Sequence, residues 1–194
     1  WDIYCAMTLY GIYLLLMGLW ELVIQPSLDS LSGMDGEVWT GNFDFTILKP
    51  VDKLFYVSIR KWRIFALFDL LLAIGVLGYS IFKVGYSIGW VEGVTFIIAL
   101  FGGLLALYSL MLLLTSLVLF KPTFLFTWIF GYMIQLGRFP VTLYPGWLRL
   151  VLTWVFPVAV MTTIPAEALR GNVSLPQVVF TLFGSIILTI VSAR

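Results

Sequence analysis

The sequence predicts an all-α, polytopic membrane protein, and three observations support this prediction. Long, almost uncharged apolar segments alternate with shorter segments that carry most of the charges. The chain is 61% hydrophobic and only 11% charged, whereas soluble domains are about 25% charged. The long segments can cross a hydrocarbon core of about 30 Å, because an α-helix rises about 1.5 Å per residue. We therefore expect a single transmembrane domain over residues 1–194.

Composition also argues against several classes of function. The net charge of +1 provides no strong basic field for nucleic acid. Histidine is absent and Cys5 is the only cysteine, so the usual metal ligands and an intrachain disulfide are missing. The sequence has neither a G-x-x-x-x-G-K-[ST] phosphate loop nor a nucleophile–base pair with a third partner. We expect no enzymatic activity in this chain by itself, no metal and no bound cofactor.

The first span is expected at residues 3–24. It should end before Pro26, because a proline disfavours helical geometry in the residue that precedes it. Gly11 and Gly18 lie seven residues apart and therefore share one helix face. Small residues on a shared face let two membrane helices approach closely, although ordinary tolerance of glycine explains the pair equally well. Since the chain opens with Trp1, we also expect at least one more helix upstream.

Residues 36–61 are expected to form a cytosolic amphipathic segment. Apolar side chains recur with helical spacing between Val51 and Ile59, and charged side chains fill most of the other positions. This pattern is typical of a helix that lies on a membrane surface or against a partner protein. A simple interfacial lead-in to the next span has the same pattern, so both interpretations stay open.

The next two spans are expected at residues 62–83 and 88–120. Asp69 would lie about two turns inside the first of them, and a carboxylate within a membrane suggests a functional role by default. A structural ion pair with Arg60 or Arg63 is the better explanation, because both arginines are close in sequence. Like Asp69, Glu92 lies near the end of its span.

The span at residues 88–120 is too long for one straight crossing. Gly102-Gly103 in its middle indicates a bend or a tight helix crossing. Beyond it, the apolar pieces at 123–137 and 148–164 are both short for a span and are separated by dense Pro and Gly. One of these pieces must cross while the other dips in and returns, and the residues alone leave that choice open. A last span is expected at residues 173–193.

The distribution of Lys and Arg predicts the orientation. Alternating spans place seven of these residues on one side and only Lys83 and Arg170 on the other whichever piece crosses, while Arg138 and Arg149 depend on that choice. The side with seven is therefore expected to be cytoplasmic. Its members are Lys49, Lys53, Arg60, Lys61, Arg63, Lys121 and Arg194.

Two motifs carry a resemblance to a known family. The segment from Trp39 to Asp52, WTGNFDFTILKPVD, resembles the G-E-F-D-x-x-L-x-R-P segment of bacterial ATP-binding-cassette (ABC) type-2 permeases, in their branch with about six helices per subunit. Asn42 replaces the usual acidic residue and Lys49 the usual arginine. The later proline-rich run, residues 138–166, matches the same branch. The resemblance covers essentially the whole chain, without the family's first helix and its short basic C-terminal tail.

The resemblance implies an exporter transmembrane domain with a cytosolic coupling helix that docks on a separate ATPase subunit. It places this coupling contact within residues 36–56 and assigns 123–137 to the fifth helix and 141–165 to a re-entrant pair before the last span. The coupling residues would be Gly41, Phe43, Asp44, Phe45, Leu48, Lys49, Pro50 and Asp52. The re-entrant or gate residues would be Pro140, Tyr144, Pro145, Arg149, Pro157 and Pro165.

The family couples ATP hydrolysis on two cytosolic subunits to alternating access in two membrane subunits, usually to export lipids, glycans or drugs. The resemblance therefore implies a second permease subunit, ATP and Mg on the ATPase, and a location in the bacterial cytoplasmic (inner) membrane. Few charges and many aromatic side chains suit a hydrophobic or amphipathic substrate. An ion-coupled secondary transporter, which would use intramembrane charges such as Asp69 and Glu92, and a non-transporting scaffold remain as alternatives.

Overall fold

In the computed structural model, the described part of the chain is helical apart from turns and connecting loops. The structure describes residues 3–32, 35–85, 89–120, 126–139, 143–152, 159–171, 173 and 175–192. The longer helices are α1 (Ile3–Leu19), α5 (Ala66–Val84), α6 (Trp90–Phe120), α7 (Phe126–Gln135) and α10 (Leu175–Ser192). The shorter ones are α2 (Gln25–Asp29), α3 (Asn42–Ile47), α4 (Lys53–Ile59), α8 (Gly146–Leu150) and α9 (Ile164–Leu169). A π-helical turn (Trp20–Ile24) joins α1 to α2, another (Ala159–Thr163) precedes α9, and a 3₁₀ turn (Leu136–Arg138) follows α7.

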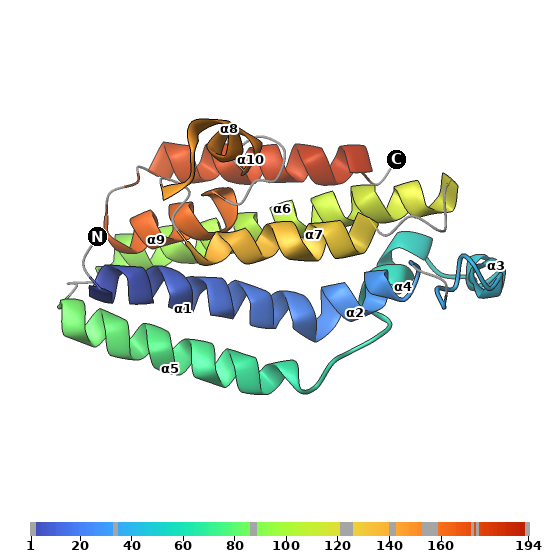
Figure 1. Ribbon diagram of the computed structural model, residues 1–194, viewed down its shortest axis with the longest axis horizontal. Coiled ribbons are helices and arrows are strands. Elements are labelled where there is room, and N and C mark those ends of the chain that lie inside the picture. The colour runs from blue at the N-terminus through green and yellow to red at the C-terminus, as the bar shows by residue number, and fades with distance from the viewer. Residues whose placement is uncertain are drawn as a thin grey trace.

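The long helices run roughly along one axis, and the chain passes back and forth between the two ends of the molecule (Figure 1). The end that holds α2, α3 and α4 also lies near the C-terminus, whereas the N-terminus lies at the opposite end. Among the described residues, three helices are long and apolar enough to cross a membrane: Ile3–Asp29, Ala66–Val84 and Trp90–Val118. The apolar helix Pro176–Ser192 is shorter.

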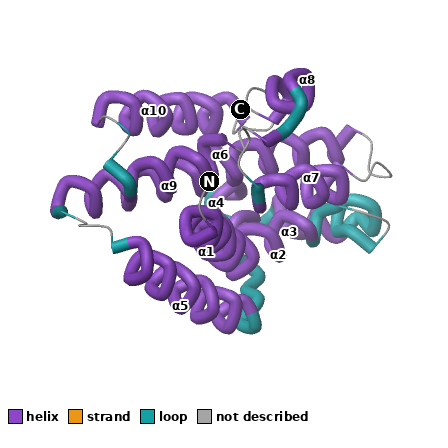
Figure 2. Tube along the Cα trace, turned by 60° about the vertical axis from the view of Figure 1, so that its left-hand side comes forward, coloured by secondary structure: helices purple, strands orange, loops and turns teal. Residues whose placement is uncertain are grey.

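The first helix forms the centre of the bundle. Figure 2 shows α1 in the middle, with α5 on one side and α6, α7 and α9 on the other. Its side chains Leu9, Ile12 and Leu16 are almost completely buried and belong to one cluster with Leu107 of α6 and Phe130 of α7. Helix α5, by contrast, turns most of its large apolar side chains outward. In a membrane such an apolar outer face meets lipid at no cost.

The two glycines on one face of α1 pack against α5 of the same chain. A Cβ atom added at Gly11 would lie 2.8 Å from Cγ of Leu77, and one added at Gly18 would lie 2.9 Å from Leu70. Only hydrogen fits in that space, so these glycines set the close approach of α1 to α5. Helix α6 runs without a break through Gly102-Gly103, and a Cβ at Gly102 would lie 3.7 Å from Leu182 on α10. Gly102 therefore lies where α6 packs against α10.

The first helix does not end before Pro26, as the sequence suggested, but continues to Asp29. The N–H of Gln25 donates to the carbonyl of Trp20 five residues earlier, which opens a wider turn ahead of the proline. Pro26 has no N–H for the carbonyl of Leu22, and the backbone N–H of Arg63 donates to that carbonyl instead, at 2.9 Å. A contact between distant parts of the chain thus replaces the bond that proline removes.

The start of the second expected span also differs from the sequence-based expectation. Helix α5 begins at Ala66 rather than at residue 62, because residues 60–65 pass along the π-helical turn and α2 before the helix starts. The expected span at 123–137 contains α7, which has 10 residues, followed by its 3₁₀ turn. Within the expected re-entrant segment 141–165, Met161 is buried in the main core cluster with residues of α1 and α6.

Candidate functional site

The end of the molecule that holds α3 and α4 exposes an unusual number of large apolar side chains. Phe45 is 71% exposed and Leu48 is 78% exposed. We call this set the tip patch: Trp39, Phe45, Leu48, Val51 and Phe55, all at least half exposed. Exposed charged side chains alternate with them in the same segment, and we call these its rim: Asp44, Lys49, Asp52 and Lys53. Exposed large apolar side chains with charged neighbours are characteristic of a surface that binds another molecule.

Local sequence signals build the tip patch. Gly41 adopts a left-handed conformation with φ of 75° and so lets the chain turn into α3. Asp52 caps α4, because its side chain accepts a hydrogen bond from the N–H of Phe55 at 2.9 Å. Lys49 donates to the hydroxyl of Tyr56 and lies over its ring, 4.3 Å from the centroid. The two short helices are therefore held in a defined arrangement.

The predicted coupling residues divide into two groups in the structure. Phe45, Leu48, Lys49, Pro50 and Asp52 are exposed, as are Gly41 and Asp44. Phe43 instead is half-buried and packs with Val38 against the core cluster. Trp39, which the sequence analysis did not select as a coupling residue, belongs to the tip patch. Its place at the start of the motif from Trp39 to Asp52 was the signal that could have selected it.

A second candidate site is a groove between the first helix and α7. It holds a cavity of about 160 Å³. Its lining includes polar side chains that recur along one face of the first helix, and others from α7 and the following turn. We call it the polar groove and name its polar lining residues here: Tyr13, Glu21, Gln25, Asp29, Gln135 and Arg138. The sequence analysis did not find this groove, since Gln and Tyr scattered over two distant segments give no local pattern.

The polar groove extends along the first helix well beyond its first turns. The guanidinium of Arg138 lies over the ring of Tyr13, 5.8 Å from the centroid, and Tyr13 is about 15 Å along the helix from Ile3 at about 1.5 Å per residue. Gln135 and Arg138 are exposed. Polar groups at membrane depth face protein or water rather than lipid. The outer face of α5, with Phe68 and Leu71, has the opposite character.

The two acidic residues proposed as intramembrane charges lie at the starts of helices. Asp69 is in the first turn of α5 and is exposed, and Glu92 is in the first turn of α6. Acidic side chains are favourable there, because the N-terminal end of a helix carries partial positive charge. The expected ion pair of Asp69 with Arg60 or Arg63 is not formed. Arg60 pairs with Glu37 and Arg63 pairs with Glu21, at 2.5 and 3.2 Å.

The predicted gate residues are partly described. The hydroxyl of Tyr144 donates to the carbonyl of Leu136 at 2.8 Å and so ties the segment before α8 to the turn after α7. Pro145 immediately precedes α8, exposed Arg149 lies within it, and buried Pro165 lies in the first turn of α9. Pro140 and Pro157 lie outside the described residues. Within the described ranges, no group of three or more Cys, Asp or Glu side chains is arranged to hold a metal ion.

Comparison with known protein families matches residues 1–194 to the family described as "ABC-2 family transporter protein". No curated protein and no solved structure matches the chain. The family match extends over the whole chain, so it includes both the tip patch and the polar groove.

Proposed function

The chain belongs to the ABC-2 transporter family, and we propose that it is the permease subunit of an ATP-driven exporter that works by alternating access. It is a multi-pass membrane protein, and members of this family are membrane subunits without the ATPase domain. Family membership therefore implies an ATPase partner, and ATP and Mg would bind to that partner. We place the assembly in a bacterial cytoplasmic membrane, with a second permease subunit of the same or a homologous kind.

The tip patch is the observation that carries this proposal. A chain without a phosphate-binding loop must receive the energy of hydrolysis through a contact, and the tip patch offers apolar anchors with a charged rim. It lies on the expected cytosolic segment, together with Lys49, Lys53, Arg60 and Lys61. In this proposal α3 and the turn before α4 form the coupling element, and α8 and the π-helical turn Ala159–Thr163 belong to the re-entrant pair.

The polar groove supports the transport part of the proposal. Its lining combines amides, carboxylates and Arg138 with the aromatic side chains Trp20 and Phe130. Such a surface suits the polar part of an amphipathic substrate, whose apolar part would stay in contact with apolar side chains or lipid. A lipid, a glycolipid or an amphipathic drug fits this description. We propose that the substrate path runs along the groove, on the face of the subunit opposite to α5.

The rival functions have less support. An ion-coupled transporter needs ionisable groups or broken helices near the midplane, whereas Asp69 and Glu92 lie in the first turns of their helices. A scaffold has no need of a polar groove at membrane depth.

Purification of the full-length protein from its native membrane tests the proposal. A cytosolic ATPase should copurify, and the complex in liposomes should hydrolyse ATP faster when lipid extracted from the same membrane is supplied. Flux driven by an ion gradient without ATP would favour the secondary transporter. A preparation with neither ATPase nor flux would favour the scaffold.

A further inference from the structure

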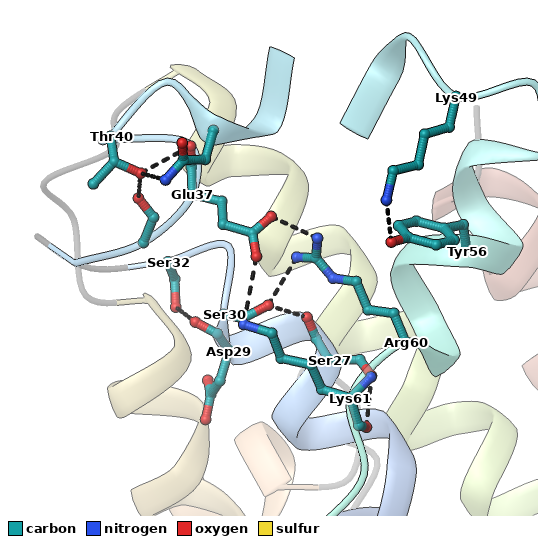
Figure 3. Close-up of polar contacts among 12 residues, drawn as sticks. Ser27, Asp29, Ser30, Ser32, Glu37, Thr40, Lys49, Tyr56, Arg60 and Lys61 are labelled. Carbon is teal, nitrogen blue, oxygen red and sulfur yellow. Dashed lines mark hydrogen bonds and ion pairs between the residues drawn. The ribbon is translucent and has the colours of Figure 1, made fainter. Parts of the chain in front are cut away.

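A compact polar cluster lies where three segments meet: α2, the loop before α3 and the end of α4. It consists of Glu37 from the loop before α3, Arg60 and Lys61 from the end of α4, and Ser27 and Ser30 from α2 and the residue after it (Figure 3). None of these residues belongs to the tip patch or to the polar groove. We call this set the latch.

Arg60 is the centre of the latch. One arm of its guanidinium donates to Oε2 of Glu37 at 2.5 Å, and the other donates to Oγ of Ser30 at 2.8 Å. Nζ of Lys61 lies 3.4 Å from the other carboxylate oxygen of Glu37. Only arginine can reach two acceptors at once with a rigid, planar group.

The ion pair is shielded from water. The side chain of Arg60 is 8% exposed and that of Glu37 is 19% exposed, whereas the Arg63–Glu21 pair is 56% and 31% exposed. Attraction between opposite charges strengthens as water is excluded. Removal of one partner from a buried pair leaves an uncompensated charge and is therefore strongly unfavourable. A shielded pair of this kind resists separation more than an exposed one.

Hydrogen bonds of the backbone connect the latch to α3 on one side and to the first helix on the other. The carbonyl of Glu37 accepts a hydrogen bond from the N–H of Phe43 in α3. The N–H of Glu37 donates to the carbonyl of Ser30. The N–H of Lys61 donates to Oγ of Ser27, and Oγ of Ser27 donates to the carbonyl of Lys61, each at 3.0 Å. Two residues later, the N–H of Arg63 bonds the carbonyl of Leu22. The latch thus joins α3 and α4 to the first helix and to the lead-in of α5.

We propose that the Glu37–Arg60 pair is a positioning pair that makes α3, α4 and the first helix move as one body. Motion of an ATPase on the tip patch then reaches the polar groove, whose wall is the first helix. If the pair were separated, the tip could shift on the ATPase while the first helix stayed in place. This inference rests on the proposed function, because it assumes that a partner moves the tip patch and that the groove responds.

The test measures how accessible the wall of the polar groove is to water, so it needs no known substrate. In a Cys5→Ala background, Met17→Cys places one thiol in the groove wall. Its rate of reaction with a water-soluble methanethiosulfonate reagent is measured for the full permease–ATPase complex, without nucleotide and after trapping with ATP and vanadate. We expect the two rates to differ, because alternating access would change how far water and the reagent reach the groove wall.

Four latch variants and one control are compared in this background. Glu37→Gln and Arg60→Lys should bring the ratio of the two rates close to one, while the rate without nucleotide, the amount of bound ATPase and basal hydrolysis stay near those of the parent. Ser30→Ala should give an intermediate ratio, since it removes one of the two acceptors of Arg60. The swapped pair Glu37→Arg with Arg60→Glu should recover part of the ratio. Lys83→Gln removes a charge at the far end of α5 and should leave the ratio unchanged.

The outcomes separate the two proposals. If the parent complex binds no ATPase, or shows no nucleotide-dependent rate, the proposed function fails and this inference fails with it. If the rate changes with nucleotide in the parent, and changes by the same factor in Glu37→Gln and Arg60→Lys, the latch does not transmit motion. The permease assignment then stands. If these variants lose the ATPase altogether, the pair only shapes the tip patch, and the positioning role is likewise overturned.

Discussion

Phe43 and Phe45 show how two residues of one type, two positions apart, acquire different roles. Both lie on α3 and both fit the apolar pattern of the sequence. Phe43 packs inward against the core cluster with Val38, whereas Phe45 is 71% exposed. Residues two positions apart on a helix point to different sides, because each residue turns the chain by about 100°. Phe43 therefore contributes to the stability of α3, whereas Phe45 contributes to the surface that is available for binding.

We predict that Phe45→Ala weakens ATPase association without lowering stability, and that Phe43→Ala does the reverse. Loss of a half-buried phenylalanine should lower the free energy of unfolding by about 1–3 kcal/mol, less than the full cost of a buried one. Loss of an exposed anchor should cost binding energy only, by about 1–2 kcal/mol. Thermal unfolding in detergent and quantitative copurification measure the two effects. Equal effects of both variants on both measurements would contradict the assignment of the tip patch.

A charge reversal tests the rim of the same surface. Asp44→Arg should leave membrane insertion and thermal unfolding unchanged, because Asp44 is exposed. It should reduce ATPase association and remove the stimulation of hydrolysis, since rim charges fix the register of an interface. The basal activity of the ATPase should survive, because its own site is untouched. Full stimulation in the variant complex would show that α3 is merely interfacial.

At the scale of elements, α1 shows how a helix in lipid is held without a hydrophobic driving force. Close packing against α5 depends on Gly11 and Gly18, which leave no room for a side chain. The continuous helix Ile3–Asp29, of which α1 is the first part, passes Pro26 because the N–H of Arg63 supplies the missing backbone donor. Packing and an imported hydrogen bond, rather than helix propensity, therefore fix where this helix lies and where it ends.

We predict that Gly11→Ala destabilises the protein, because the new methyl group would lie 2.8 Å from Cγ of Leu77. A strained core contact of this kind costs about 1–3 kcal/mol, which thermal unfolding in detergent would detect. The second substitution Leu77→Ala should recover part of the loss by opening space. Gly75→Ala is the matched control, because a Cβ there meets no atom within 4 Å. Equal melting temperatures for Gly11→Ala and Gly75→Ala would contradict the close approach.

At the scale of the whole molecule, the two faces of the bundle differ in the environment that they suit. The outer face of α5 is apolar, while the groove between the first helix and α7 is polar. The polar cluster around Glu37 and Arg60 lies at one end together with the tip patch. The subunit thus has a surface suited to lipid, a surface suited to a polar path and an end suited to a cytosolic partner.

We predict that this end and the opposite end are accessible from different sides of the membrane. Single cysteines replace Thr40, in the loop before α3, and Lys83, in the last turn of α5, each in a Cys5→Ala background. A membrane-impermeant maleimide should label the second in intact cells and the first only after the membrane is opened. Labelling of both from one side would overturn the arrangement of the spans.

The sequence by itself determined the helical membrane class, the family and the approximate places of the long apolar helices. These properties are local, because hydropathy and helix length are read from consecutive residues. The segment around Phe45 was likewise marked by a contiguous motif. The residues alone left open which of the pieces at 123–137 and 148–164 crosses, since a short, proline-broken segment has no length that decides it.

Only the tertiary structure decided which residues meet. Arg60 and Arg63 were expected near Asp69, yet they bind Glu37 and Glu21, because residues 60–65 pass along the first helix before α5 begins. The polar groove combines residues more than 100 positions apart, such as Tyr13 and Arg138. Sequence patterns record the period of one helix, whereas partners across helices depend on how those helices are packed. For this reason neither the latch nor the polar groove could be predicted from the sequence, and both follow from the packing of the helices.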